Sequence, residues 1–124
     1  MTPPALVNGK INYVEIPAID IQRSADFYAN VFGWRIKRRE DGSTAFEDTT
    51  GEVSGTWVVG RPPSAEPGLL IFIIVEDVSK ALETVAAQGG TIVGWVSENT
   101  PEIGRFHDPA GNVIGLFQKP GAGA

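Results

Sequence analysis

The sequence predicts an α+β fold made of two βαβββ modules, whose strands form one curved eight-stranded mixed sheet, an open barrel, with the helices outside. Two observations lead to this prediction. The stretch from Tyr13 to Gly33 reads as a strand, a capped helix and a glycine stop, and at an offset of 57 residues it matches the stretch from Leu70 to Gly90. Three further strands, separated by turns, follow each copy. Such a repeat constrains the architecture more than any local pattern does.

The first module opens with a predicted strand at Ile11–Ile16, whose β-branched and aromatic residues favour extended backbone. Pro17 has no N–H to donate and is expected to end the pairing. Asp20 is a suitable N-cap for the following helix, and Gly33 permits the left-handed residue that closes it. The apolar residues between them recur at steps of four, three and four positions, as on one helical face: Ile21, Ala25, Tyr28 and Phe32.

Three more strands complete the first module, at residues 34–39, 44–48 and 53–59. The dipeptide Asp41-Gly42 marks the turn between the first two, because Asp-Gly tolerates a positive φ. Residues 60–68 contain three prolines and link the two modules.

The second module repeats this order, with a predicted strand at residues 70–75. Asp77 caps a helix that Gly89-Gly90 stops, and Val78, Leu82 and Val85 form its buried face. The remaining strands are predicted at residues 91–96, 103–107 and 113–118, with a loop at 97–102 and a Pro- and Gly-containing turn at 108–112.

These boundaries define one domain at residues 9–120, with module one at 9–62 and module two at 67–120. Residues 1–8 are predicted to be a lead with little to hold it in place, and residues 121–124 a frayed tail. A chain of 124 residues is long enough to bury a core without disulfides.

The composition excludes several classes of function. The chain contains no cysteine, so thiolate catalysis and thiolate metal sites are excluded. The net charge of −5 opposes nucleic-acid binding. The basic run Arg35, Lys37, Arg38, Arg39 is interpreted as a solvated sheet edge that resists aggregation. Without a signal peptide or a membrane-length apolar run, we expect a cytoplasmic protein with no membrane partner.

Three segments carry a family resemblance: residues 15–34, residues 75–90, and the run Phe106-His107-Asp108-Pro109-Ala110-Gly111-Asn112 leading into Ile114-Gly115-Leu116-Phe117. With them the chain resembles the vicinal oxygen chelate superfamily, which includes glyoxalase I, bleomycin-resistance proteins and extradiol dioxygenases. The resemblance spans residues 9–120 and implies the fold. It leaves the activity open, because the superfamily holds isomerases, dioxygenases, resistance enzymes and drug-binding proteins.

The resemblance also implies where a metal would be held. Catalytic members use four side chains, in the first and last strands of each half. Carried over, these positions fall on Tyr13 and Leu70 in the first strands and on Trp57 (or its neighbour Val58) and Gly115 in the last strands. Divalent cations prefer carboxylate, imidazole or carbonyl ligands, which these side chains do not supply. We therefore expect a member without the family's metal, and without another cofactor.

Candidate functional residues follow from strand alternation, which places Tyr13 and Glu15 on one face of the first strand. By the resemblance, that face lines a concave ligand site. Glu15 could bind a cationic or hydroxyl-bearing ligand or act as a base; the alternative is a structural pair with a neighbouring arginine. His107, the only histidine, could act as an acid or base or simply close a strand.

Aromatic residues could supply the walls of such a site. We place Trp57 on the matching face of the fourth strand, with core packing as the alternative. Trp95 and Phe117 are the candidates in the second module.

The function predicted from these observations is a metal-free small-molecule-binding protein of the glyoxalase/bleomycin-resistance type, holding an organic ligand in an aromatic cup. The acidic balance favours a cationic or aromatic ligand. The alternative is a metal-independent isomerase, epimerase or lyase that uses Glu15, Tyr13 or His107 as acid and base. A third possibility is an interaction module that buries the face against a protein partner. The resemblance also implies a homodimer.

Overall fold

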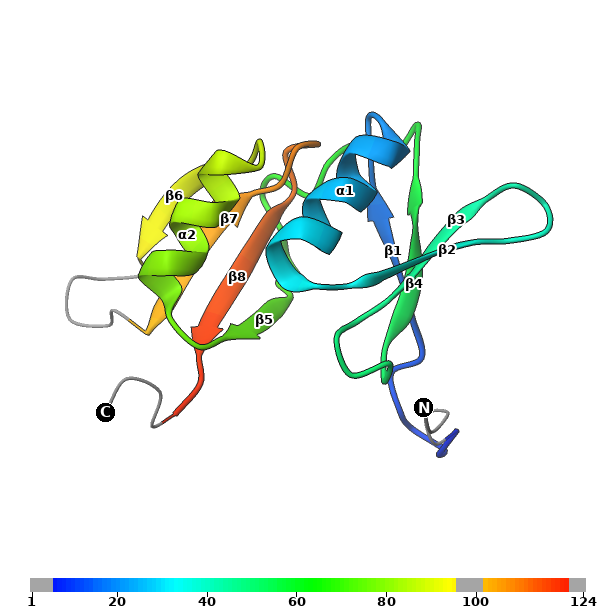
Figure 1. Cartoon of the computed structure of the whole chain (residues 1–124), viewed down its shortest axis with the longest axis horizontal. Helices are drawn as coiled ribbons and strands as arrows, with labels where there is room; N and C mark the ends of the chain where they lie inside the picture. Colours follow the sequence, from blue (N-terminus) through cyan, green and yellow to red (C-terminus); the bar gives the residue numbers. More distant parts are fainter. Residues whose placement is uncertain (1–5, 96–101, 121–124) are drawn as a thin grey trace. The chain divides into compact units, whose positions relative to one another are not determined.

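The computed structural model describes residues 6–95 and 102–120, and the chain divides into two compact units, Met1–Arg61 and Pro62–Ala124. Each unit has the order βαβββ (Figure 1). This confirms the α+β class and the repeated module. The predicted tail at 121–124, and the predicted loop at 97–102 apart from Glu102, lie outside the described residues.

The first unit contains one helix and one sheet. Its elements are β1 (Tyr13–Pro17), α1 (Ile21–Phe32), β2 (Arg35–Arg38), β3 (Thr44–Glu47) and β4 (Ser54–Val58). The strand order is β1-β4-β3-β2; β1 runs parallel to β4, and the other neighbours are antiparallel. Contrary to the prediction, Pro17 does not end the pairing: it is the last residue of β1, opposite Val58, and the next amide, Ala18 N–H, still donates to the Val58 carbonyl at 2.9 Å.

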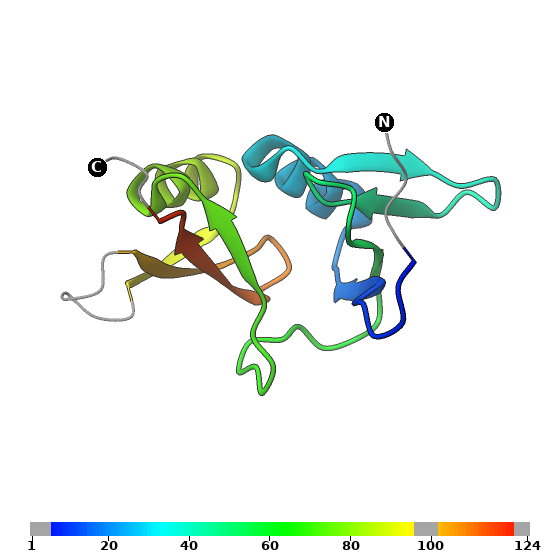
Figure 2. The same cartoon turned by 90° about the horizontal axis from the view of Figure 1, so that it is seen from below.

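The second unit has the same topology. Its elements are β5 (Phe72–Val75), α2 (Val78–Ala87), β6 (Thr91–Trp95), β7 (Ile103–His107) and β8 (Val113–Gln118). The order is β5-β8-β7-β6, with β5 parallel to β8. Figure 2 shows α2 lying on one side of this sheet. The eight predicted strands are thus all present, in two sheets of four, and the joining of both sheets into one curved surface stays a prediction.

Both helices begin and end as their sequences predict. Asp20 accepts a hydrogen bond from the Arg23 amide, and Asp77 accepts one from the Lys80 amide, each at 3.1 Å. Gly33 adopts φ 73° after α1. After α2, however, the left-handed residue is Gly89, with φ 100°, so the second helix closes one position earlier than the 57-residue offset implies.

The core of the first unit is an aromatic cluster between α1 and the sheet. Tyr28, which is fully buried, stacks on Trp34, and Trp34 stacks on Phe46, each pair with ring centroids 4.6 Å apart. The ring of Trp57 lies 4.8 Å from that of Phe46 and completes the cluster. Burying a side chain of this size contributes about 1.5–3 kcal/mol, so the cluster is what attaches α1 to its sheet.

An aspartate organises the last hairpin in each unit. Asp48 accepts hydrogen bonds from the amides of Glu52 and Val53 in the turn between β3 and β4. Asp108 does the same between β7 and β8: it is 3 % exposed and accepts from the Ala110 amide and from both the amide and the side chain of Asn112, at 2.9–3.0 Å. These carboxylates accept hydrogen bonds from turn amides that have no carbonyl partner in a neighbouring strand.

We predict that Asp108→Ala lowers the free energy of unfolding by about 2–4 kcal/mol, because it leaves several buried donors without an acceptor. The measurement is urea unfolding followed by circular dichroism. Asp41→Ala is the matched control, since Asp41 also organises a hairpin turn but is exposed, where it accepts hydrogen bonds from the amide and the hydroxyl of Ser43. Equal losses for the two variants would contradict a special role for the buried aspartate.

Candidate functional site

The sheet of the first unit has two unlike faces. One packs against α1 and carries the buried Ile16, Phe46 and Trp57. We call the other the open face, because in the described part of the first unit no helix lies on it. Register and alternation place these residues on it: Tyr13 and Glu15 from β1, Ser54, Thr56 and Val58 from β4, Ala45 and Glu47 from β3, and Arg35 and Lys37 from β2.

Glu15 is held on the open face by an ion pair. Its Oε1 lies 2.7 Å from Nη2 of Arg61, and the two side chains are 45 % and 50 % exposed. Arg61 follows β4 by three residues, so the chain that leaves the sheet turns its guanidinium back towards β1. The ion pair with an arginine, which was one of the two interpretations of Glu15 from sequence, is therefore present. Both charged groups of this pair remain accessible to solvent.

A second contact joins opposite corners of the same face. Tyr13 begins β1 at one edge, whereas Arg39 follows β2 at the other edge and at the other end of the sheet. Arg39 Nη2 nevertheless donates to Tyr13 Oη at 2.5 Å, with its guanidinium carbon 5.6 Å from the ring centroid.

This contact has a geometric consequence. A twisted sheet is saddle-shaped, so one diagonal of each face is concave. The approach of Tyr13 to Arg39 makes this diagonal of the open face the concave one, and Ala45, which lies between them, is only 6 % exposed. The open face therefore curves inward along this diagonal within the first unit.

The basic run of the sequence lies partly on this face. Arg35 Nε and Lys37 Nζ lie 3.6 and 3.1 Å from the same carboxylate oxygen of Glu47. Arg38 points to the other side and donates to Gln22 of α1 at 3.2 Å. The run does form an edge strand, as interpreted from sequence, but alternation also brings Arg35, Lys37 and Arg39 together. Sequence reasoning missed this grouping, although the period of two in the run signals it.

Trp57 is not on the open face, and its predicted position there is wrong. In the parallel ladder Trp57 is opposite Ile16, whereas Glu15 is opposite Thr56. Trp57 is 3 % exposed and packs between Tyr28 and Phe46. Core packing, the alternative considered from sequence, is what the structure shows for this residue. Its buried Nε1 has no hydrogen-bond partner among the described residues.

The same ladders correct the position implied for a metal ligand. Glu15 pairs with Thr56 in the first unit, and Phe72, which is 57 residues beyond Glu15, pairs with Gly115 in the second. The equivalent of Gly115 is therefore Thr56, not Trp57 or Val58. The Thr56 hydroxyl already donates to the Thr44 carbonyl at 2.6 Å.

The corrected set of family positions still lacks metal-binding donors. It comprises Tyr13, Thr56, Leu70 and Gly115, with neither a carboxylate nor an imidazole among them. A Cβ added at Gly115 would lie 2.6 Å from the Phe72 ring, so that ring occupies the space a longer side chain would need. Across residues 6–95 and 102–120, no group of three His, Asp or Glu side chains is placed to hold a metal ion.

The second sheet also has a face turned away from its helix. Phe72, Ile74 and Phe117 are exposed there, and the ladders place Arg105 and His107 on the same side. His107 is the last residue of β7, at the strand end expected from sequence. Trp95 is the last residue of β6, and its side chain lies outside what the structure describes. His107 and Glu15 belong to different units, so this structure does not define a joint role for them.

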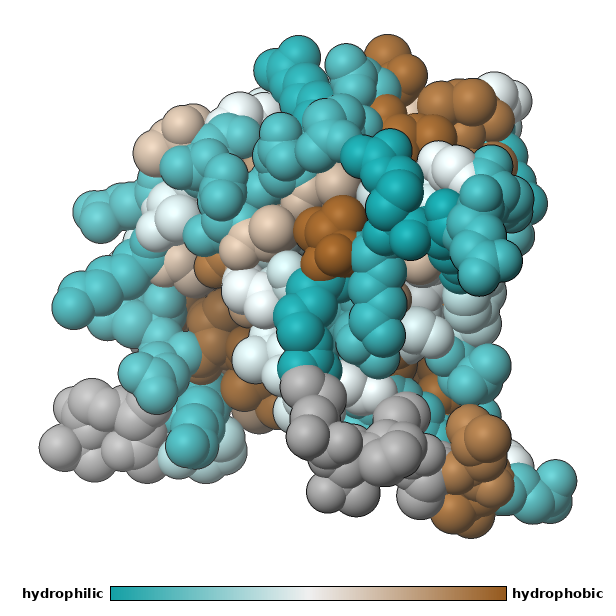
Figure 3. Space-filling view, turned by 45° about the vertical axis from the view of Figure 1, so that its right-hand side comes forward, coloured by the Kyte–Doolittle hydropathy of each residue, from teal (hydrophilic) through white to brown (hydrophobic). Residues whose placement is uncertain are grey.

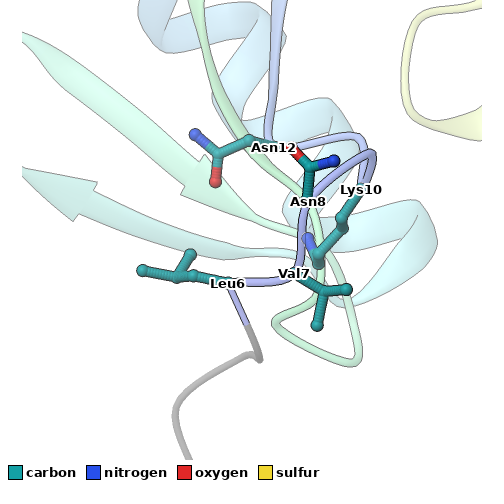
Figure 4. A pocket seen from close by; sticks show the side chains of 5 residues that line it. All are labelled: Leu6, Val7, Asn8, Lys10 and Asn12. Atoms are coloured by element: carbon teal, nitrogen blue, oxygen red, sulfur yellow. The ribbon is translucent and has the colours of Figure 1, made fainter.

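One surface hollow lies elsewhere, in the segment that leads into β1 (Figure 4). It has a volume of about 400 Å³ and is lined by Leu6, Val7, Asn8, Lys10 and Asn12. Lys10 Nζ donates to the carbonyls of Ile11 and Glu52, which satisfies the one charged group in the hollow. A single short segment forms its lining, and we assign it no role.

One side of the surface can be followed in the space-filling view of Figure 3. The side shown in Figure 3 is largely hydrophilic, with its hydrophobic residues in a few small groups. Within the described residues, no helix is long and apolar enough to cross a bilayer.

Comparison with known proteins gives a consistent family. A sequence profile of the Glyoxalase/Bleomycin resistance protein/Dioxygenase superfamily matches residues 10–116. A glyoxylase-like domain-containing protein of Didymella fabae is 29 % identical, covering 94 % of this chain and 98 % of that protein. Lactoylglutathione lyase of Neisseria meningitidis is 30 % identical, covering 81 % and 83 %.

Solved structures show the same fold at lower identity. TnmS3, an antibiotic binding protein from Streptomyces sp. CB03234, superposes with a TM-score of 0.66 at 22 % identity, covering 92 % of this chain and 98 % of that one. The fosfomycin resistance protein FosX from Listeria monocytogenes superposes with a TM-score of 0.73 at 15 % identity, covering 92 % and 93 %.

We predict that Trp57→Ala lowers the free energy of unfolding by about 3–5 kcal/mol, because it empties the centre of a packed aromatic cluster. Trp57→Phe should cost less, since the lost indole N–H has no partner among the described residues. Denaturant titration measures both changes. A Trp57→Ala protein with unchanged stability would contradict the core position assigned to this residue.

Proposed function

This chain belongs to the Glyoxalase/Bleomycin resistance protein/Dioxygenase superfamily, and from that premise we propose that it binds an organic small molecule on the open face of its first sheet without using a divalent metal. The observation that carries the proposal is the open face, which is concave along the diagonal from Tyr13 to Arg39. It presents the Tyr13 ring and the Glu15–Arg61 pair to solvent, between corners that Arg39 draws together.

The chemistry of these groups suits binding. Tyr13, which is 41 % exposed, offers an aromatic surface with a polar end. Glu15 and Arg61 offer an acceptor and a planar set of donors that can orient a polar group of the ligand. Phe117 and Trp95, the aromatic candidates of the second unit, stay predictions from the sequence.

The residue types support metal independence. At the four family positions a divalent ion would meet a phenol, a threonine hydroxyl that is already bonded, a leucine and a glycine. Such ions bind where several carboxylates or imidazoles converge. The residues present do not fit the family's metal, and the proposed function therefore uses no step that depends on one.

Binding of an organic molecule has a parallel among the similar structures, since TnmS3 is an antibiotic binding protein. The alternative of a metal-independent isomerase, epimerase or lyase is less well supported. Its candidate groups Glu15 and Tyr13 are engaged by Arg61 and Arg39, and His107 belongs to the other unit. The homodimer and the cytoplasmic location expected from sequence stay predictions.

The proposal predicts binding that survives a chelator. We expect flat aromatic compounds from a fragment library, titrated in the presence of EDTA, to shift the ¹⁵N–¹H resonances of β1 and β4. Tyr13→Ala should weaken the best of them about fivefold, because an aromatic contact contributes roughly 1 kcal/mol. Ile19→Ala, which truncates an exposed apolar side chain in the same unit, should change affinity less than about twofold.

Two results would count against the proposal. One is binding that appears only when Zn²⁺ or Mg²⁺ is added. The other is a set of shifted resonances confined to residues 6–12, which would move the ligand to the hollow that precedes β1.

A further inference from the structure

We propose that the ligand of the open face is an organic oxyanion, a carboxylate, phosphonate or phosphate ester, selected by Arg39 and Arg61. This inference rests on the proposed function and specifies the chemical class of its ligand. It differs from the cationic ligand expected from the net charge of the chain.

The charges on the open face oppose those of the whole molecule. Four cations lie on it or reach onto it, namely Arg35, Lys37, Arg39 and Arg61, against the two carboxylates of Glu15 and Glu47. The face therefore has an excess of positive charge in a chain whose net charge is −5. At physiological salt, charges more than about 8 Å away are largely screened, so a bound ligand responds chiefly to the groups that touch it.

Arg39 is the cation best placed to receive an anion. The oxygens to which it donates are neutral hydroxyls, those of Tyr13 at 2.5 Å and Ser43 at 3.5 Å. The nearby Asp41 is bonded to Ser43, whose hydrogen bonds are the main reason that the pKa of Asp41 is lowered; the charge of Arg39 is a smaller cause. The N–H groups of the Arg39 guanidinium can therefore donate to a ligand without first breaking a hydrogen bond to a carboxylate.

Arg35 adds positive charge beside these residues. Its Nε lies 3.6 Å from Glu47, whose carboxylate is shared with Lys37, so one carboxylate faces two cations. Because Nε and Nη2 of Arg35 are buried, this residue contributes its charge to the open face rather than these two donors.

Arginine is also the side chain suited to this task. Its guanidinium binds carboxylate and phosphate oxygens through two parallel hydrogen bonds, and these charge-assisted bonds are about twice as strong as neutral ones. Arg61 is half exposed and makes one close contact with Glu15, at 2.7 Å. A ligand oxyanion can therefore approach Arg61 from the solvent side while Glu15 holds the side chain in place.

The test uses two aromatic probes of opposite charge, phenylphosphonate and phenyltrimethylammonium, titrated into the 124-residue chain and followed by ¹⁵N–¹H spectra. We expect phenylphosphonate to shift the resonances of residues 13–17, 35–39 and 54–61, and the cation to leave them in place. Raising the NaCl concentration from about 20 mM to about 300 mM should weaken phosphonate binding, because the attraction is between partly exposed charges.

Three variants locate the effect. Arg39→Gln and Arg61→Gln should each weaken phenylphosphonate by about tenfold, the loss of one charge-assisted bond. Arg38→Gln is the matched control: it removes the same charge from the same basic run, but from the side that faces α1, and should change affinity less than about twofold. Glu15→Gln should change phosphonate affinity less than either arginine variant, because it removes both a competing carboxylate and the ion pair that holds Arg61 in place.

Each contrary result has a definite meaning. If phenyltrimethylammonium binds this face and phenylphosphonate does not, the ligand class is wrong while the proposed function stands. If Arg38→Gln weakens binding as much as Arg39→Gln, the effect is one of overall charge and the assigned site is wrong. If neither probe shifts these resonances, and no flat aromatic compound does so, the proposed function fails as well.

Discussion

The residue-by-residue pairing of β1 with β4 decides the chemistry of the first unit. In this parallel ladder Ile16 is opposite Trp57, and Glu15 is opposite Thr56. Side chains alternate between the two faces of a strand, so a slip of one residue would exchange the aromatic core for the charged face. The buried cluster of Trp57, Phe46 and Tyr28 makes such a slip costly, because it would expose large apolar rings and bury Glu15.

The same constraint is met differently in the two units. At the position where the first unit pairs a glutamate with a threonine, the second pairs Phe72 with a glycine, and the phenylalanine ring lies over the place that a side chain would fill. At this position one face is therefore charged and the other apolar, although the topology is identical. In both units, the side chains at the positions that the family resemblance implies for metal ligands are not metal-binding groups. The proposed function therefore depends on direct contacts with the ligand.

Much of the fold could be predicted from sequence because its signals are local. The caps at Asp20 and Asp77, the stop at Gly33 and the Asp108 turn each depend on a few adjacent residues. The face of the sheet on which Trp57 lies could not be predicted in this way, because the offset between the two units is not constant. After α2 the left-handed glycine is Gly89, one position before the residue that the 57-residue offset matches to Gly33, and the later hairpins differ in length between the units. A shift of one residue is enough to move a side chain across the sheet.

The contacts that define the candidate site could not be predicted from the sequence either. Whether Arg39 meets Tyr13 depends on the twist of four strands, and whether Arg61 turns back to Glu15 depends on the chain beyond β4. Net charge does not define the ligand for a related reason, since it sums over all surfaces and does not describe one face. Residue types and periodicity thus indicated which side chains are available, whereas tertiary geometry determined which of them act together.

The central claim is that this chain binds an organic ligand without a divalent metal. Native mass spectrometry of the untagged protein as purified, with and without a chelator, tests this most directly. The account predicts either the bare mass or an added organic mass that survives the chelator. An added mass equal to one divalent ion, removed by the chelator, would contradict it and would require metal ligands other than those at the four family positions.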